Sequence, residues 1–150
     1  MIRRATIADA EHIQRLINQF ADQGRLLPRS LSEIYDNLRD FHVYEDKDRS
    51  IVGVCALHIS WEALAEIRSL AVATEARKNG IGAQLVEACL EEARQLGVTR
   101  VFLLTYIPPY FERAGFRPVD KSTLPHKIWA DCIRCVKFPD CDENAMIIDL

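Results

Sequence analysis

The stretch Arg77-Lys78-Asn79-Gly80-Ile81-Gly82 lies between a predicted strand and a long predicted helix. Glycine at positions 80 and 82 lets the backbone approach a ligand closely, because neither residue carries a Cβ. The first turn of a helix leaves N–H groups without partners and carries a partial positive charge. Arg77 and Lys78 add charge beside that turn. Together these features are typical of a phosphate-binding site.

Two well-known phosphate loops do not fit this stretch. A dinucleotide loop needs G-x-G-x-x-G, but the third position after Gly82 is Leu85. A nucleoside-triphosphate loop needs G-x-x-x-x-G-K-[ST], which is absent from the sequence. The pattern that remains is R-x-x-G-x-G. The simplest alternative to a phosphate-binding loop is a strand-to-helix turn in which glycine only relieves backbone strain and no ligand binds.

Hydrophobic patterning predicts an α/β chain, with a mixed twisted sheet and helices on both faces. Helical spacing and capping residues predict four helices, which begin after Thr6, at Ser30, at Gly80 and at Tyr110. The segment over residues 64–105 reads as strand, helix and strand, so its two strands should be parallel. Six strands are predicted, at residues 2–5, 41–45, 50–60, 64–72, 100–105 and 145–148.

Composition bounds the class of protein. The 150 residues are 49% apolar and 27% charged, which suits a single globular domain over residues 1–150. The net charge of −3 argues against a broad basic surface for nucleic acid. No apolar run approaches the ~20 residues that span a bilayer, and the first residues lack an apolar signal core. With five cysteines, an odd number, the chain is expected in the reducing cytoplasm.

The pattern R-x-x-G-x-G at Arg77–Gly82, together with Leu70-Ala71-Val72 before it and the segment YFERAGF at residues 110–116, resembles the GNAT superfamily of acetyltransferases. This resemblance implies the GNAT fold, of six to seven strands and about four helices. It also implies acetyl-CoA as co-substrate, with no metal required for catalysis. The implied coenzyme contacts are Leu70, Ala71, Val72, Arg77, Lys78, Asn79, Gly80, Ile81, Gly82, Ala83, Phe111 and Arg113.

The resemblance also implies a general base, because several GNAT enzymes carry a glutamate where this chain has Glu66. Acetyl transfer to an amine needs the amine to lose a proton, which a carboxylate on a mostly buried strand can accept. The alternative is that Glu66 only pairs with Arg68 or another neighbour. Alternation along a strand predicts one shared face for Glu66, Arg68, Leu70 and Val72.

The general acid is less clear from the residues. Many family members place a tyrosine where this chain has Phe111, and on a helix Tyr110 is expected to point elsewhere. Tyr106, at the end of a buried strand, is the candidate in its place. Otherwise the thiolate leaves unprotonated, which the modest pKa of a thiol allows.

Residues 23–30 and 116–120, with Leu124-Pro125, resemble N-acetylglutamate synthases of the short stand-alone type. The resemblance implies that the amine of L-glutamate, or of glutamine, attacks acetyl-CoA directly in a ternary complex, as the first step of arginine biosynthesis. The carboxylates of such an acceptor need cationic partners, for which Arg29, Arg68 and Lys127 are candidates. Each could equally be a solvated surface residue.

Three cysteines form the pattern C-x2-C-x5-C at Cys132, Cys135 and Cys141. With His126 or Asp142 as a fourth ligand this could hold zinc, but we favour reduced thiols without metal. Cys55 and Cys89 read as small core residues.

Two rival functions remain at this point. One is acetylation of another amine, such as a protein lysine, a polyamine or an aminoglycoside. The other is a non-catalytic acyl-CoA sensor. No membrane or nucleic-acid partner is expected, and a homodimer is compatible with the family.

Overall fold

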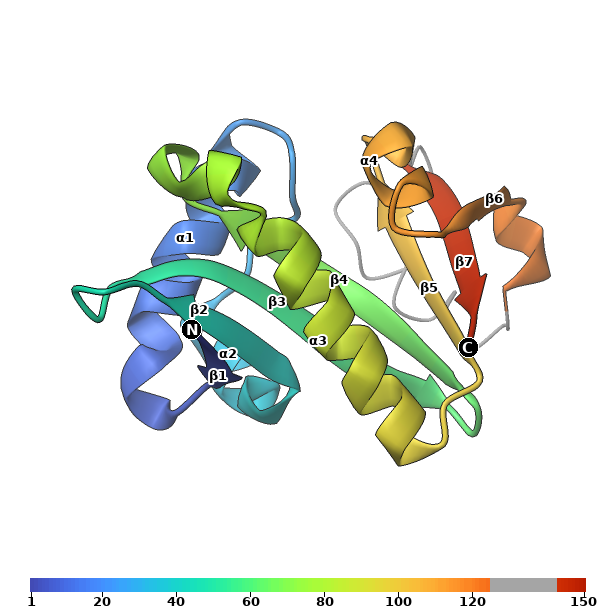
Figure 1. Cartoon of the computed structure of the whole chain (residues 1–150), viewed down its shortest axis with the longest axis horizontal. Helices are drawn as coiled ribbons and strands as arrows, with labels where there is room; N and C mark the ends of the chain where they lie inside the picture. The colour runs from blue at the N-terminus through green and yellow to red at the C-terminus, as the bar shows by residue number, and fades with distance from the viewer. Residues whose placement is uncertain (125–142) are drawn as a thin grey trace.

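The computed structural model describes residues 1–124 and 143–150 of the chain. Within these residues the strands form one mixed sheet of seven, in the order β1-β2-β3-β4-β5-β7-β6 (Figure 1). Only β4 and β5 are parallel; the other neighbouring strands are antiparallel. The strands are β1 Ile2–Arg4, β2 Phe41–Glu45, β3 Ile51–Trp61, β4 Leu64–Val72, β5 Arg100–Thr105, β6 Arg117–Val119 and β7 Asn144–Asp149.

Helices cover both faces of this sheet, as the sequence predicts. One apolar core joins α1 and α2 to β2 and β3, and a second core joins α3 and α4 to the other face. Figure 1 shows α3 crossing in front of the sheet, with α1 behind it. The described helices are α1 Ala10–Asp22, α2 Leu31–Asp36, α3 Ile81–Leu96 and α4 Pro108–Glu112. None of the described helices is long and apolar enough to cross a membrane.

Local sequence signals account for the helix boundaries. Thr6 and Asp9 form a capping box before α1, and Ser30 with Glu33 forms one before α2. These boxes satisfy N–H groups that the first helical turn leaves without partners. α3 ends at Gly97, whose φ of 85° is a left-handed conformation that glycine adopts without strain.

Two predictions about the late part of the chain need correction. α4 begins at Pro108 and ends at Glu112, whereas the sequence predicts it over residues 110–114. Proline fits the first helical turn, because an N–H group there would have no hydrogen-bond partner within the helix and its absence costs nothing. The sequence also missed strand β6, which has three residues, includes Pro118 and pairs with β7 at the sheet edge.

A β-bulge interrupts β4 where it pairs with β3. Val54 lies opposite Ala71, and Ala56 lies opposite Arg68, so β4 holds one residue more than β3 between these pairs. Ser69 lies in this bulge with a φ of 56°, a backbone conformation that residues with a side chain rarely adopt.

The bulge reverses the direction in which later side chains of β4 point. Before it, Ile67 packs in the α3 core; after it, Ala71 packs in the α1 core. An inserted residue has this effect because side chains alternate along a strand. The prediction of one common face is therefore wrong. Glu66 and Arg68 lie on the α1–α2 side of the sheet, whereas Leu70 and Val72 pack toward α3.

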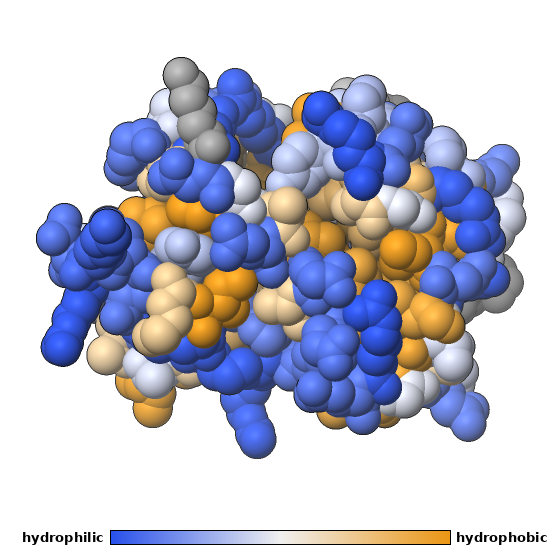
Figure 2. All heavy atoms as spheres, viewed as in Figure 1, coloured by the Kyte–Doolittle hydropathy of each residue, from blue (hydrophilic) through white to orange (hydrophobic). Residues whose placement is uncertain are grey.

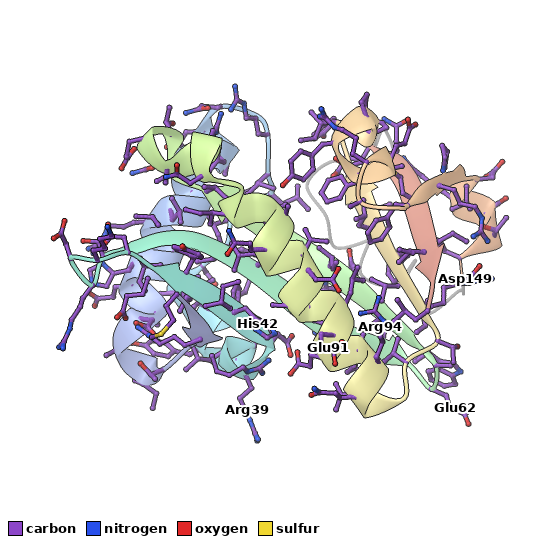
Figure 3. The ribbon with its side chains drawn as sticks, in the orientation of Figure 1. Arg39, His42, Glu62, Glu91, Arg94 and Asp149 are labelled. Carbon is purple, nitrogen blue, oxygen red and sulfur yellow. The ribbon has the colours of Figure 1, made fainter. Side chains whose placement is uncertain are left out.

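Polar side chains of α3 face solvent or pair with charged neighbours. Figure 2 shows mostly hydrophilic atoms over the outer surface of this helix. His42 on β2 lies beside α3 (Figure 3), and its Nε2 is 3.1 Å from a carboxylate oxygen of Glu92. Burial is the largest effect on the pKa of His42 and lowers it. This cluster lies on the α3 side of the sheet, opposite the α1–α2 side that carries Glu66.

Candidate functional site

A cleft opens where β4 and β5 separate. The two strands pair only from Leu64 and Arg100 to Glu66 and Phe102. Beyond these residues the strands diverge toward the start of α3 and toward α4 (Figure 1). A cleft of about 550 Å³ fills this opening. Its walls come from β4 residues 66–72, from residues 103–107, from the α1–α2 loop, and from Arg77, Gly82, Tyr110 and Phe111.

The beginning of α3 forms one end of the cleft. Gly80 caps the helix with a φ of 69°, and no side chain caps the first turn. No acidic residue lies in that turn, so the partial positive charge of the helix end is not neutralised locally. Gly82 lines the cleft, and the hydroxyl of Tyr110 occupies the space that a Cβ on this residue would need. This geometry suits a diphosphate, as the glycine pattern predicts.

Arg77 is fixed beside this helix end by two contacts. Its guanidinium carbon lies 4.9 Å from the ring centre of Phe20 on α1, a cation–π distance. Its Nε donates to the carbonyl oxygen of Val72 at 3.4 Å. The side chain is otherwise exposed and lines the cleft, so its charge is available to an anionic ligand.

The structure brings half of the proposed coenzyme residues to the cleft. These are Leu70, Ala71, Val72, Arg77, Gly82 and Phe111. Of the remainder, Ile81 is buried in the α3 core, and Arg113 is exposed outside the cleft. Asn79, Gly80 and Ala83 adjoin the helix start without lining the cleft. Lys78 shares this segment, but its side chain lies outside the described part of the structure.

Glu66 and Arg68 form an ion pair on the α1–α2 side of β4. The Arg68 Nε donates to Oε1 of Glu66 at 2.5 Å, and both side chains are mostly buried. Both residues line the cleft. The pairing that the sequence offered as an alternative is therefore present, and it leaves Glu66 facing the space where β4 and β5 separate.

Tyrosines on the opposite wall correct a second expectation. Tyr110 does not point away from the site: it lines the cleft, and its hydroxyl reaches Gly82 on α3. Phe111 is buried, with its ring 5.9 Å from that of Phe116. Burial raises the pKa of Tyr110, which keeps its hydroxyl protonated. Tyr106 also lines the cleft, where the sequence proposes it.

Three further arginines line the cleft, two of them from the α1–α2 loop and one from β4. Arg29 and Arg68 are there as the sequence proposes, and Arg25 joins them. Arg29 also pairs with Glu33 at 3.3 Å across one helical turn. Arg25 was not among the predicted site residues, although it lies with Arg29 in residues 23–30. Lys127 lies outside the described residues.

The cysteine pattern also falls outside what the structure describes. Cys132, Cys135 and Cys141, with His126 and Asp142, belong to residues 125–142. Among residues 1–124 and 143–150, no group of His, Cys, Asp and Glu side chains is arranged to hold a metal ion. Cys55 and Cys89 are free and fully buried, as predicted.

The sequence is similar to those of known acetyltransferases. Residues 8–116 match the acetyltransferase (GNAT) family. An uncharacterised N-acetyltransferase of Chlorobaculum tepidum is 42% identical over 146 residues, which is 97% of this chain and 94% of that protein. An amino-acid acetyltransferase of Mycobacterium tuberculosis is 33% identical over 136 residues, which is 89% of this chain and 78% of that protein.

A solved structure extends the similarity to three dimensions. It is the N-acetylglutamate synthase of Neisseria gonorrhoeae, complexed with coenzyme A and N-acetyl-glutamate. It has a TM-score of 0.91 and 29% sequence identity, and the match covers all of this chain. The chain spans 35% of that longer protein.

Proposed function

Because the chain belongs to the GNAT acetyltransferase family, we propose that it transfers the acetyl group of acetyl-CoA to the α-amine of L-glutamate. Acetyl-CoA-dependent N-acetyl transfer follows from the family itself. The identity of the acceptor is the proposal. The observation that carries it is the lining of the cleft, which includes Arg25, Arg29 and Arg68 together with Glu66, the ion-pair partner of Arg68.

The coenzyme end is the start of α3. The diphosphate of the coenzyme would lie against the first turn of α3 and Gly82, with Arg77 beside it. Lys78, Asn79, Gly80, Ile81 and Ala83 supply the backbone of this loop in the proposal. Beyond Glu66 β4 no longer pairs with β5, so the edge of residues 70–72 that faces away from β3 is available to the pantetheine arm.

The arginines of the cleft favour an acceptor with two carboxylates. A guanidinium binds a carboxylate through two parallel hydrogen bonds, which adds orientation as well as affinity. Glutamate offers one carboxylate beside its α-amine and a second on its side chain. Glutamine keeps the first only, so it is the natural competitor. The residues proposed to bind the acceptor are Arg29, Arg68 and Lys127 from the sequence, with Arg25 from the structure.

Glu66 is the proposed general base. The ion pair with Arg68 holds the carboxylate in one orientation on the cleft wall. It accepts the proton that the amine loses, directly or through water, while the amine attacks the thioester carbon. The backbone N–H groups near residues 70–72 would donate to the developing oxyanion. No acyl-enzyme intermediate is required.

Two tyrosines can donate a proton to the departing thiolate. Tyr106 is the residue that the sequence proposes, and it lines the cleft beyond the end of β5. Tyr110 is the second candidate, because its hydroxyl lies at the start of α3 and burial raises its pKa. A raised pKa keeps this group in its donating form.

Two glutamates in the cleft favour the rival acceptor class. Glu66 and Glu143 both line the cleft, and they would attract a polyamine or a lysine side chain. The same lining holds four arginines, including Arg77, so the charge balance supports an anionic acceptor.

An assay of thiol release from acetyl-CoA tests the proposal. The panel contains the common amino acids, spermidine and a lysine peptide. L-glutamate should give the highest kcat/KM, with glutamine next, and mass spectrometry should find the N-acetyl product. Preference for spermidine or the peptide would overturn the acceptor. Coenzyme binding without turnover of any amine would support a sensor instead. Production of N-acetylglutamate would place the chain at the entry to arginine biosynthesis.

A further inference from the structure

A histidine and an aspartate lie behind the proposed general base. His58 on β3 and Glu66 on β4 are opposite each other in the antiparallel register. Side chains of directly opposite residues leave the same face of a sheet, with Cβ atoms about 4.5–5.5 Å apart. Asp40, which precedes β2, lies 2.7 Å from Nδ1 of His58 through its Oδ2. Asp40, His58 and Glu66 therefore follow one another across the α1–α2 side of the sheet.

The contact with Asp40 fixes the tautomer of His58. An ionised carboxylate can only accept a hydrogen bond, so Nδ1 of His58 must carry the proton. Nε2 then carries the free lone pair of the neutral ring. In the described part of the chain no residue forms a hydrogen bond with this Nε2. The ring is therefore held through Nδ1, and Nε2 can accept a hydrogen bond.

The surroundings of the pair are polar and reach solvent. The charged groups near it are Glu66 and Arg68 from β4, and Arg29 and Glu33 around α2. A cavity of about 20 Å³ lies between α2 and the sheet, lined among others by Asp40, Arg68 and Ser69. That volume can hold a single water. The side chain of His58 is 31% exposed, so a proton on it can leave to bulk water.

We propose that the Asp40–His58 pair receives the proton from Glu66 and releases it to solvent on the α2 side. The step rests on the proposed function, in which Glu66 takes a proton from the acceptor amine. The Glu66 carboxylic acid gives its proton to Nε2 of His58, directly or through one water, and Glu66 is again a carboxylate. The imidazolium, stabilised by Asp40, then loses the proton to water. His58 and Asp40 act through Glu66 and are positioning residues.

Chemical rescue tests the pathway directly. In His58→Ala we expect kcat to fall about tenfold, with the KM values for acetyl-CoA and the acceptor within about twofold. Added imidazole should restore kcat in proportion to its concentration, because it replaces the missing base. His12→Ala is the matched control, since His12 is exposed on α1 and contacts only Arg15 among the described side chains. An unchanged kcat, or a fall that imidazole does not restore, would overturn the proposal.

A second variant and a second readout keep the test decisive if His58→Ala folds poorly. Asp40→Asn keeps the shape of the side chain and removes its charge, so kcat should fall while thermal stability stays near that of the parent protein. Independently of turnover, Glu66→Gln should move the side-chain 15N resonances of His58. If these resonances do not move, the proposed proton transfer from Glu66 to His58 is wrong. A protein that acetylates no amine would instead defeat the proposed function, and the resonances would still report whether the two side chains are coupled.

Discussion

The hydroxyl oxygen of Tyr110 occupies the space that a Cβ on residue 82 would need, so only glycine fits there while Tyr110 keeps its orientation. This contact joins α4 to the first turn of α3. It connects a candidate proton donor to the proposed diphosphate site. Glycine at this position therefore has two possible roles, to admit the tyrosine and to admit the coenzyme, and mutations can separate them.

Gly82→Ala should destabilise the protein by about 1–3 kcal/mol, because the new methyl group overlaps the Tyr110 hydroxyl. In a Tyr110→Phe background the nearest atom of that side chain would be the ring carbon at 3.4 Å, so the penalty should largely disappear. Denaturant unfolding of the parent protein, the two single variants and the double variant measures the coupling between residues 82 and 110. Equal penalties in both backgrounds would contradict the contact.

Calorimetry on the same four proteins measures coenzyme A affinity. If the methyl group itself blocks the diphosphate, binding should weaken about tenfold in both backgrounds. Affinity that is unchanged by Gly82→Ala in the Tyr110→Phe background would count against the loop at the start of α3.

Glu66→Gln should lower kcat by about 100-fold or more, because the amide keeps the shape of the carboxylate and cannot accept a proton. Affinity for acetyl-CoA should stay within about twofold. Glu62→Gln serves as the control, since Glu62 is exposed in the turn between β3 and β4 (Figure 3). Near-normal turnover of Glu66→Gln between about pH 6 and pH 9 would reject Glu66 as the base.

Arg29→Gln should raise KM for glutamate by about tenfold or more and leave KM for acetyl-CoA unchanged, because one carboxylate partner is lost. The partly exposed pair with Glu33 contributes less than about 1 kcal/mol, so the protein should stay folded. Arg15→Gln on α1 is the control. Steady-state kinetics with each substrate varied in turn would show the split, and equal KM values for glutamate in both variants would remove Arg29 from the acceptor site.

Asp9→Asn should destabilise the protein by about 2 kcal/mol near neutral pH. The side-chain hydrogen bond from Arg3 lowers the pKa of Asp9 from 3.8 to about 2. A lowered pKa means that the stabilisation is complete above about pH 4 and is lost as the pH falls toward 2. Denaturant unfolding of parent and variant should therefore differ at neutral pH and converge near pH 2. The exposed Asp48→Asn should differ at neither pH.

Much of the fold could be predicted because its signals are local. The capping pairs at Thr6 and Ser30 and the glycine that ends α3 act within a few residues, so sequence spacing is enough to find them. The residues themselves give no signal for the bulge at Ser69, because serine does not favour a φ of 56° and the pairing with β3 imposes it. The orientation of Tyr110 was predicted wrongly because it depends on the residue at which α4 begins.

The sequence alone determined the order of the four helices and of six of the seven described strands, the glycine-containing start of α3 and the family, since each depends on neighbouring residues or on a short pattern. Only the tertiary structure decided which side chains share a wall of the cleft. β4 and β5 must separate, and a bulge must reverse the alternation, before Glu66 and Arg68 face the α1–α2 side while Leu70 and Val72 face α3. Such placements depend on contacts between segments far apart in the chain, which no local pattern encodes.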